Sequence, residues 1–146
     1  MSKKKKQQLG DLPPRFRFFL NPYKDFRFTR CPQCNRKTKA RKHPILIHID
    51  PQQLVILNMT GKYCPKCDLL ILHQDKVEEL LAVAMLGHNA DVIGNDYLVI
   101  GTVDRKGWRE ARKNPHGLQT TFGFMHDFKE HVTFEIAHYG WGPADE

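Results

Sequence analysis

Apolar residues along this chain cluster in short runs that have the length and period of β-strands. Residues 45–49 and 54–57 are rich in β-branched side chains, and the proline-containing segment 50–53 separates them, which predicts a β-hairpin. Residues 68–72 predict a further buried strand. Residues 26–30 alternate apolar and polar side chains and predict a half-buried strand.

One segment has the helical period instead. Asp75 with Glu78 three residues later suggests a capping box at its start, and Gly87 marks its end. Its apolar stripe at positions i, i+3, i+4 and i+7 consists of Val77, Leu80, Leu81 and Ala84. Further apolar residues widen this surface and predict that the helix packs on more than one side; they are Val83, Met85 and Leu86.

The C-terminal part predicts more strands. Residues 97–103 are apolar on both faces, as in a central strand, and residues 132–136 alternate as a strand with one wet face does. Residues 105–114 form a polar turn or a short helix that Pro115 ends, and the isolated Gly94 and Gly101 have structural roles.

The cysteines change this picture most. Cys31-Pro32-Gln33-Cys34 and Cys64-Pro65-Lys66-Cys67 are matching tetrapeptides that use all four cysteines of the chain. Two such pairs are typical of one tetrahedral Zn²⁺ site, with two thiolates from each turn. Four sulfur ligands leave no position for water or substrate, so the site is structural rather than catalytic. We therefore expect one structural zinc ion held by Cys31, Cys34, Cys64 and Cys67.

Together these patterns predict an α+β fold in which zinc-ribbon-like β-hairpins pack with one helix and a further antiparallel β region extends them. Residues 1–14 predict a disordered basic tail. Residues 15–89 form the zinc-ribbon-like domain, and residues 90–146 form a β-rich extension packed as one unit with it.

Over about residues 26–87 the chain resembles the YgiT-type zinc finger in the order of its elements. That order is a strand, the first Cys-Pro-x-Cys, a basic segment, a hairpin, the second Cys-Pro-x-Cys, a strand and a helix. That domain occurs in the N-terminal half of MqsA-like antitoxins, and the resemblance implies a structural zinc and a protein-contact surface. Where the family often has glycine after each cysteine pair, this chain has Asn35 and Asp68, which can also adopt left-handed backbone. Residues 90–146 do not predict the helix-turn-helix that follows in MqsA-like antitoxins, so operator binding does not carry over.

Charge is distributed unevenly. Residues 1–42 contain 14 Lys/Arg and 2 Asp/Glu, a net of +12, whereas residues 43–146 contain 9 and 14, a net of −5. A basic N-terminal third indicates a polyanionic partner or an acidic protein surface. Part of this charge also offsets a Zn²⁺ ion with four thiolates, whose net charge is about −2.

Two functions follow from this charge. The first is a nucleic-acid-associated or regulatory zinc protein, whose candidate contacts are Arg15, Arg17, Arg27, Arg30, Arg36, Lys37, Lys39, Arg41 and Lys42. Residues 15–30 interleave five basic residues with six Phe or Tyr, which indicates either a base-stacking surface or strands with buried rings and a wet basic face. The second function is a protein-interaction module, antitoxin-like or adaptor-like, without nucleic-acid binding.

Catalysis has weaker support. No phosphate-binding, nucleophile-elbow or zinc-protease motif occurs, and no small-molecule substrate is evident. The densest polar group, within residues 116–139, consists of His126, Asp127, His131, Glu135 and His138. On a strand, His131 and Glu135 would share a face and His138 would lie opposite, so the pattern favours ordinary surface and core histidines over a second metal site.

No apolar run approaches the roughly 20 residues of a membrane helix, and the lysine-rich start lacks the apolar stretch of a secretory signal. These features predict a location in the reducing cytoplasm, where paired cysteines bind metal rather than form disulfides.

Overall fold

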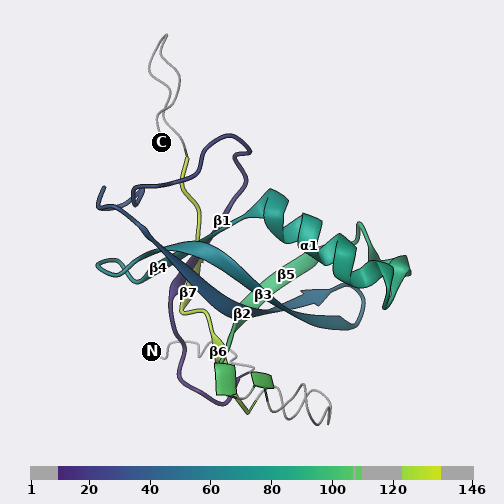
Figure 1. Ribbon diagram of the computed structural model, residues 1–146. Coiled ribbons are helices and arrows are strands. Elements are labelled where there is room, and N and C mark those ends of the chain that lie inside the picture. The colour runs from purple at the N-terminus through teal and green to yellow at the C-terminus, as the bar shows by residue number, and fades with distance from the viewer. Residues whose placement is uncertain (1–9, 107, 110–122, 136–146) are drawn as a thin grey trace, which may run out of the picture.

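The computed structural model describes residues 10–106, 108–109 and 123–135. Its elements are the strands and helices β1 (Arg17–Asn21), β2 (Lys39–Ile49), β3 (Gln53–Cys64), β4 (Leu69–His73), α1 (Gln74–Leu86), the single-turn 3-10 helix η1 (Ala90–Val92), β5 (Tyr97–Val103), β6 (Met125–Asp127) and β7 (Glu130–Val132). Within the described residues, helix α1 and a seven-stranded curled sheet make the fold α+β with an extended β region, which confirms the predicted class (Figure 1).

The centre of the sheet is the hairpin of β2 and β3. The strand order is β6-β5-β2-β3-β4-β1-β7. β2 and β3 pair over eleven positions, from Lys39 with Tyr63 to Ile49 with Gln53, so the hairpin is much longer than its apolar runs. Its outer half carries Lys39, Arg41 and Lys42, which are exposed.

The sheet closes on itself through residues 125–132. β6 and β7 stand at opposite ends of the strand order, yet only Phe128 and Lys129 separate them in the chain. Asp127 pairs with Gly101 of β5, and its carbonyl also accepts a hydrogen bond of 2.9 Å from the Arg15 N–H. One bent segment therefore joins both edges of the sheet, with β5 on one side and the chain leading into β1 on the other.

Residues 10–14 bond to the segment that closes the sheet, so this part of the expected disordered tail is ordered. The Gly10 N–H donates to Asp127 Oδ1 at 2.7 Å, and the Leu12 N–H donates to the Met125 carbonyl at 3.2 Å. Gly10 has no room for a side chain, because a Cβ there would collide with the Met125 carbonyl. Residues 10–14 thus belong to the folded unit; residues 1–9 of the expected tail lie outside the described residues.

Alternation along the strands separates an inner core from two outer clusters. Ile45, Ile47 and Ile49 of β2 face the inner core with Phe18 and α1, whereas Leu46 faces a cluster around Ile100 and Met125. The third cluster contains the cysteines. In the inner core the rings of Phe18 and Phe128 stack at 4.4 Å and 5° between planes, so the closing segment contributes directly to it.

Helix α1 lies against the curled sheet and buries Val77, Leu81 and Met85 (Figure 1). Gly87 is its C-cap, as predicted. The predicted capping box is wrong: the N-cap is His73, without a side-chain cap hydrogen bond, and Glu78 turns toward Tyr97 instead.

The expectation that the helix packs on several sides is also wrong for two residues. Val83 is 65% exposed and Leu86 is 70% exposed in the described structure. Both side chains are on the solvent-exposed side of α1, whereas Met85 is on its buried side.

Residues 26–30 do not form the predicted strand. Phe28 has φ 50°, which breaks an extended backbone, and only Arg30 makes an isolated bridge, to Lys37. The buried Asn21 holds this loop: its amide donates to the Phe26 carbonyl at 2.6 Å, and its Oδ1 accepts from the Tyr23 N–H at 2.9 Å. Alternating rings here reflect a packed loop rather than a strand.

The C-terminal predictions are met in part. β5 lies inside the sheet as expected, although Leu98 is 57% exposed. The strand predicted over residues 132–136 is wrong for residues 133–135, which are not in a strand. The strand found here, β7, ends at Val132 and pairs in parallel with β1. Trp108 donates its backbone N–H to the Asp104 carbonyl in a helical turn, while residues 107, 110–122 and 136–146 lie outside the described part of the chain.

Candidate metal centre and basic surface

The first cysteine pair is held by backbone hydrogen bonds around a tight turn. The Cys31 N–H donates to the Arg36 carbonyl at 2.8 Å, and the Asn35 N–H donates to the Cys31 carbonyl at 2.9 Å. The Gln33 N–H points at Cys31 Sγ, 3.3 Å away. Asn35 has φ 64°, so the residue after this pair takes the left-handed backbone expected of it.

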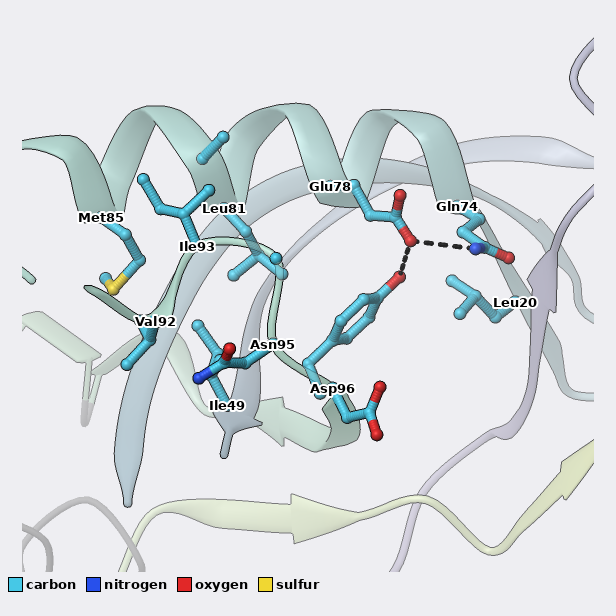
Figure 2. A pocket seen from close by; sticks show the side chains of 13 residues that line it. Leu20, Ile49, Gln74, Glu78, Leu81, Met85, Val92, Ile93, Asn95 and Asp96 are labelled. Carbon is cyan, nitrogen blue, oxygen red and sulfur yellow. Dashed lines mark hydrogen bonds between the residues drawn. The ribbon is translucent and has the colours of Figure 1, made fainter. Parts of the chain in front are cut away.

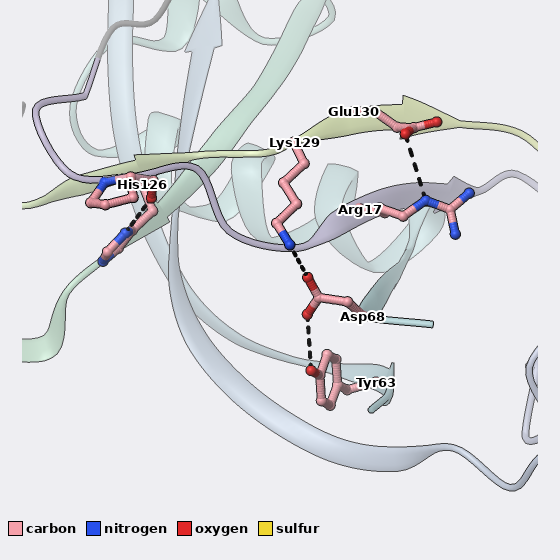
Figure 3. A network of polar contacts seen from close by, with 7 residues as sticks. Arg17, Tyr63, Asp68, His126, Lys129 and Glu130 are labelled. Carbon is pink, nitrogen blue, oxygen red and sulfur yellow. Dashed lines mark hydrogen bonds and ion pairs between the residues drawn. The ribbon is translucent and has the colours of Figure 1, made fainter. Parts of the chain in front are cut away.

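The second pair lies where β3 turns into β4, and the residue after it has the same left-handed backbone. Cys64 is the last residue of β3, and Asp68, directly after Cys67, has φ 54°. The Asp68 carboxylate fixes the turn, since it accepts from Tyr63 Oη at 3.0 Å and pairs with Lys129 Nζ at 2.8 Å (Figure 3). Lys129 comes from the segment that closes the sheet. Its ion pair with Asp68 therefore connects that segment to the turn of the second cysteine pair.

The two turns bring all four thiols together. The Sγ atoms of Cys31, Cys34, Cys64 and Cys67 lie within 4.8 Å of one another, and Cys34 Sγ is 3.5 Å from Cys64 Sγ. A tetrahedral ion with bonds of about 2.3 Å places its sulfur ligands about 3.8 Å apart. The donor set and its spacing therefore fit a metal ion with four thiolate ligands, and all four cysteines are free thiols.

The protein environment shifts the pKa values of the thiols in different directions. The backbone N–H of Arg36 lowers the pKa of Cys34 to about 7. Burial, followed by the neighbouring thiols, raises the pKa of Cys67 to about 12, and burial also raises the pKa of Cys31. Four adjacent thiolates repel one another, so a cation between them is what makes full deprotonation favourable.

An aromatic cluster packs behind the thiols. Phe19 of β1 makes edge contacts with Phe28 at 5.2 Å and with Phe134 at 5.2 Å. Tyr23 Oη donates to the Phe134 carbonyl at 3.0 Å, which ties the loop before the first cysteine pair to the chain after β7. The cysteine cluster is therefore packed against buried aromatic side chains of the fold.

A shallow, cationic depression of about 480 Å³ lies beside the cysteine turns. Apart from Pro65, every residue that lines it is basic: Arg30, Arg36, Lys37, Lys39 and Lys66. The first four of these are candidates from the sequence. Lys66 was missed because it lies in residues 43–146, whose net charge is negative, although its position inside the second Cys-x-x-Cys turn could have identified it.

A second basic group surrounds His43 on β2. The Arg15 guanidinium lies over the Phe16 ring at 4.5 Å, Arg41 lies 6.0 Å from the Tyr63 ring, and Arg105 donates to the Lys42 carbonyl at 2.8 Å. Burial, then the charges of Arg15, Arg105 and Arg41, lowers the pKa of His43 to about 4. Sequence reasoning missed Arg105 in this group, because 62 positions separate Arg105 from His43 (105 − 43).

Three candidates belong to neither group. Lys42 is exposed on β2, and only its backbone carbonyl takes part, as the acceptor from Arg105. Arg17 is half-buried, donates to Gln33 Oε1 at 2.7 Å and pairs with Glu130 at 3.7 Å, so its charge is already used within the fold (Figure 3). Arg27 is exposed and lines a different hollow, with Lys24 and Lys62.

The rings considered for base stacking are inside the protein. Phe16, Phe18 and Phe19 are 4%, 2% and 1% exposed, and Phe28 is 4% exposed. Phe26 is partly buried against Phe28. Stacking on the phenylalanines at 16, 18 and 19 is therefore excluded. The basic side chains that this segment exposes are Arg15, Lys24, Arg27 and Arg30.

The histidines and carboxylates proposed within residues 116–139 do not form a metal-binding cluster among the described residues. His126 Nδ1 lies 2.8 Å from the Pro13 carbonyl, whereas His131 packs edge-on against Phe18 and Phe128. In the described part of the chain, the cysteines are the only cluster of three or more His, Cys, Asp or Glu groups close enough to hold a metal. His138 lies outside the described residues.

No protein-family model, curated protein or solved structure matches this chain. Within the described residues, none of the helices has the length and apolar character needed to cross a bilayer.

Proposed function

We propose that this protein binds one structural Zn²⁺ ion through Cys31, Cys34, Cys64 and Cys67 and binds nucleic acid through the basic surface beside it. Zinc is the ion that four thiolates with tetrahedral spacing favour, and it brings no redox chemistry. Free thiols in such a site suit the reducing cytoplasm, where we place the protein.

The depression beside the cysteine turns is the observation that carries the nucleic-acid proposal. Its lining holds five cationic side chains and no carboxylate. Zinc with four thiolates contributes a charge of about −2. Five positive charges more than offset it, leaving about +3 for an outside partner. An excess of cations gathered in one hollow is what phosphate oxygens require.

The mode of binding follows from what is exposed. Because Phe16, Phe18 and Phe19 are buried, the surface offers arginines and lysines without aromatic platforms from these positions. Contacts of this kind go to the phosphate backbone and carry no base sequence directly. We therefore propose binding that is strong at low salt and indifferent to sequence.

Fluorescence anisotropy with random single-stranded and double-stranded oligonucleotides tests this proposal on the zinc-loaded full chain. Binding at about 50 mM salt that falls steeply by about 200 mM supports it, because phosphate contacts release counterions. No binding of either oligonucleotide at low salt would overturn it.

A protein-interaction module is the second candidate function. Val83 and Leu86, one helical turn apart on α1, are exposed and apolar, and so is Leu98 of β5. A complex formed through such side chains would depend little on ionic strength. If the protein acts in regulation through a protein partner, Leu86→Asp should abolish binding of that partner. Substitutions in the basic depression should leave this binding unchanged.

A further inference from the structure

A hollow along α1 lies on a different part of the molecule from the cysteines. It has a volume of about 580 Å³ and lies between α1 and residues 92–97, with Leu20 of β1 and Ile49 of β2 at its sides (Figure 2). Small-molecule sites commonly measure about 300–1,000 Å³ and combine an apolar lining with a few fixed polar groups.

Its floor is apolar and well packed. Ile49, Leu81, Met85 and Val92 line it, and each is buried, with 2–6% of its surface exposed. These side chains come from β2, α1 and η1, so the floor belongs to the inner core and not to a loop. An apolar group of a ligand would find fixed contacts here.

A carboxylate at the edge of the hollow is held in place. Glu78 Oε2 accepts hydrogen bonds from Tyr97 Oη at 2.8 Å and from Gln74 Nε2 at 2.9 Å (Figure 2). Both bonds reach the same oxygen. No hydrogen bond from the described residues reaches Glu78 Oε1, which leaves that oxygen to accept from a ligand.

The charges around the hollow have one sign. Glu78 and Asp96 are its ionisable carboxylates, and no Lys, Arg or His lines it. Neither carboxylate pairs with a cation of the described chain, although the whole protein carries a net charge of +7. By contrast, the neighbouring Glu79 pairs with Lys76 at 3.6 Å.

We propose that this hollow binds a small organic ammonium ion with an apolar body. The apolar body lies on the floor of Leu81 and Met85, and the ammonium group donates to Glu78 Oε1. Asp96 stands at the other end of Tyr97 and adds a second negative charge to the lining of the hollow (Figure 2). Charge complementarity favours this class of ligand: an anion would be repelled by the two carboxylates, and a neutral ligand would lack the charge-assisted hydrogen bond that an ammonium group makes. This inference does not rest on nucleic-acid binding.

The test uses the zinc-loaded full chain and three probes with the same ring: phenethylammonium, phenethyl alcohol and phenylacetate. Chemical-shift titration should place phenethylammonium at Glu78, Leu81, Met85 and Tyr97, with affinity about tenfold higher than the alcohol because a charge-assisted hydrogen bond is added. Phenylacetate should bind more weakly than either. Equal affinity for the amine and the alcohol, or shifts confined to other parts of the protein, would overturn the proposal.

Matched variants locate the charge. Glu78→Gln should reduce the affinity for phenethylammonium about tenfold and leave that for the alcohol unchanged, whereas Glu79→Gln should change neither. Asp96→Asn gives a second, exposed position that does not touch the core and should weaken the amine alone. Ala82→Trp, which places a ring in the hollow, should remove binding of both probes. Unchanged amine affinity in Glu78→Gln and Asp96→Asn would contradict the inference.

Discussion

Cys34 Sγ lies 3.5 Å from Cys64 Sγ although 30 positions separate the two residues in the chain. The hairpin of β2 and β3 creates this closeness, because it carries the chain away from the first cysteine turn and returns it in register at the second. A metal ion held at this point would tie the loop after β1 to the turn between β3 and β4. Metal binding and folding of this part of the protein should therefore be coupled.

Elemental analysis should find one zinc ion per chain, and Cys64→Ser should lose it. Zinc binding in finger peptides is worth about 10–16 kcal/mol, so hydrogen exchange around residues 28–38 and 62–70 should become fast in this variant. The exposed Thr60→Ser, a substitution of similar size on the same strand, serves as control and should keep its zinc. An unmodified chain that contains no zinc, or retains slow exchange there after chelation, would contradict the metal assignment.

His43 should make stability depend on pH. Its pKa is about 4 in the folded protein against an ordinary value of 6.5, so the unfolded chain binds the proton more readily between these values. The stabilisation from neutral His43 is complete above about pH 6.5 and is lost as pH falls toward about 4. Since the ring is partly accessible to solvent, we expect the loss to be about 1–3 kcal/mol.

The measurement is the free energy of unfolding of the protein and of His43→Gln at pH 7 and at about pH 4.5. Loss of metal at acid pH affects both proteins, so the difference between them isolates the histidine. That difference should shrink at the lower pH. A difference that is the same at both values would show that His43 titrates normally.

Gly101→Ala should destabilise the closed sheet. A Cβ at this position would collide with the His126 carbonyl of β6, and the backbone of a paired strand cannot move aside without breaking the ladder. We expect a loss of about 1–3 kcal/mol in the free energy of unfolding, measured with urea. Gly87→Ala is the matched control, because a Cβ there meets nothing within 4 Å; equal effects of the two substitutions would argue against this close approach.

Several elements were predictable because the signal for each lies within a short stretch. The β2–β3 hairpin, β4, α1 and β5 follow from local hydrophobic period and turn residues. The cluster of four cysteines was predictable for the same reason, since each Cys-x-x-Cys turn fixes two ligands locally.

Closure of the sheet was not predictable in this way. It depends on Asp127 pairing with Gly101 and with Arg15, and the strands β6 and β7 are only three residues long each. Such short segments have no period of their own, so long-range pairing determines them. The strand prediction for residues 26–30 was wrong for a related reason: the buried Asn21 and the positive φ of Phe28 form a loop whose rings happen to alternate.

The excess of basic residues could be predicted from the sequence, but the grouping of their side chains on the surface could not. The structure divides eight of the nine candidate residues among the depression, the group around His43, the hollow of Arg27 and the paired Arg17, and it leaves Lys42 exposed on β2. It also adds Lys66 and Arg105, which the charge count of the N-terminal third could not include.

The salt dependence of oligonucleotide binding tests the central claim most directly. Each phosphate-binding cation that a substitution removes should lower the slope of log affinity against log salt concentration by about 0.9 on double-stranded DNA. Lys37→Gln with Lys66→Gln, both in the depression, should therefore lower the slope by about 2, whereas Lys24→Gln with Lys76→Gln, both in a separate hollow, should leave it unchanged. Equal slopes for all three proteins would contradict the claim that the basic depression beside the metal centre is the nucleic-acid surface.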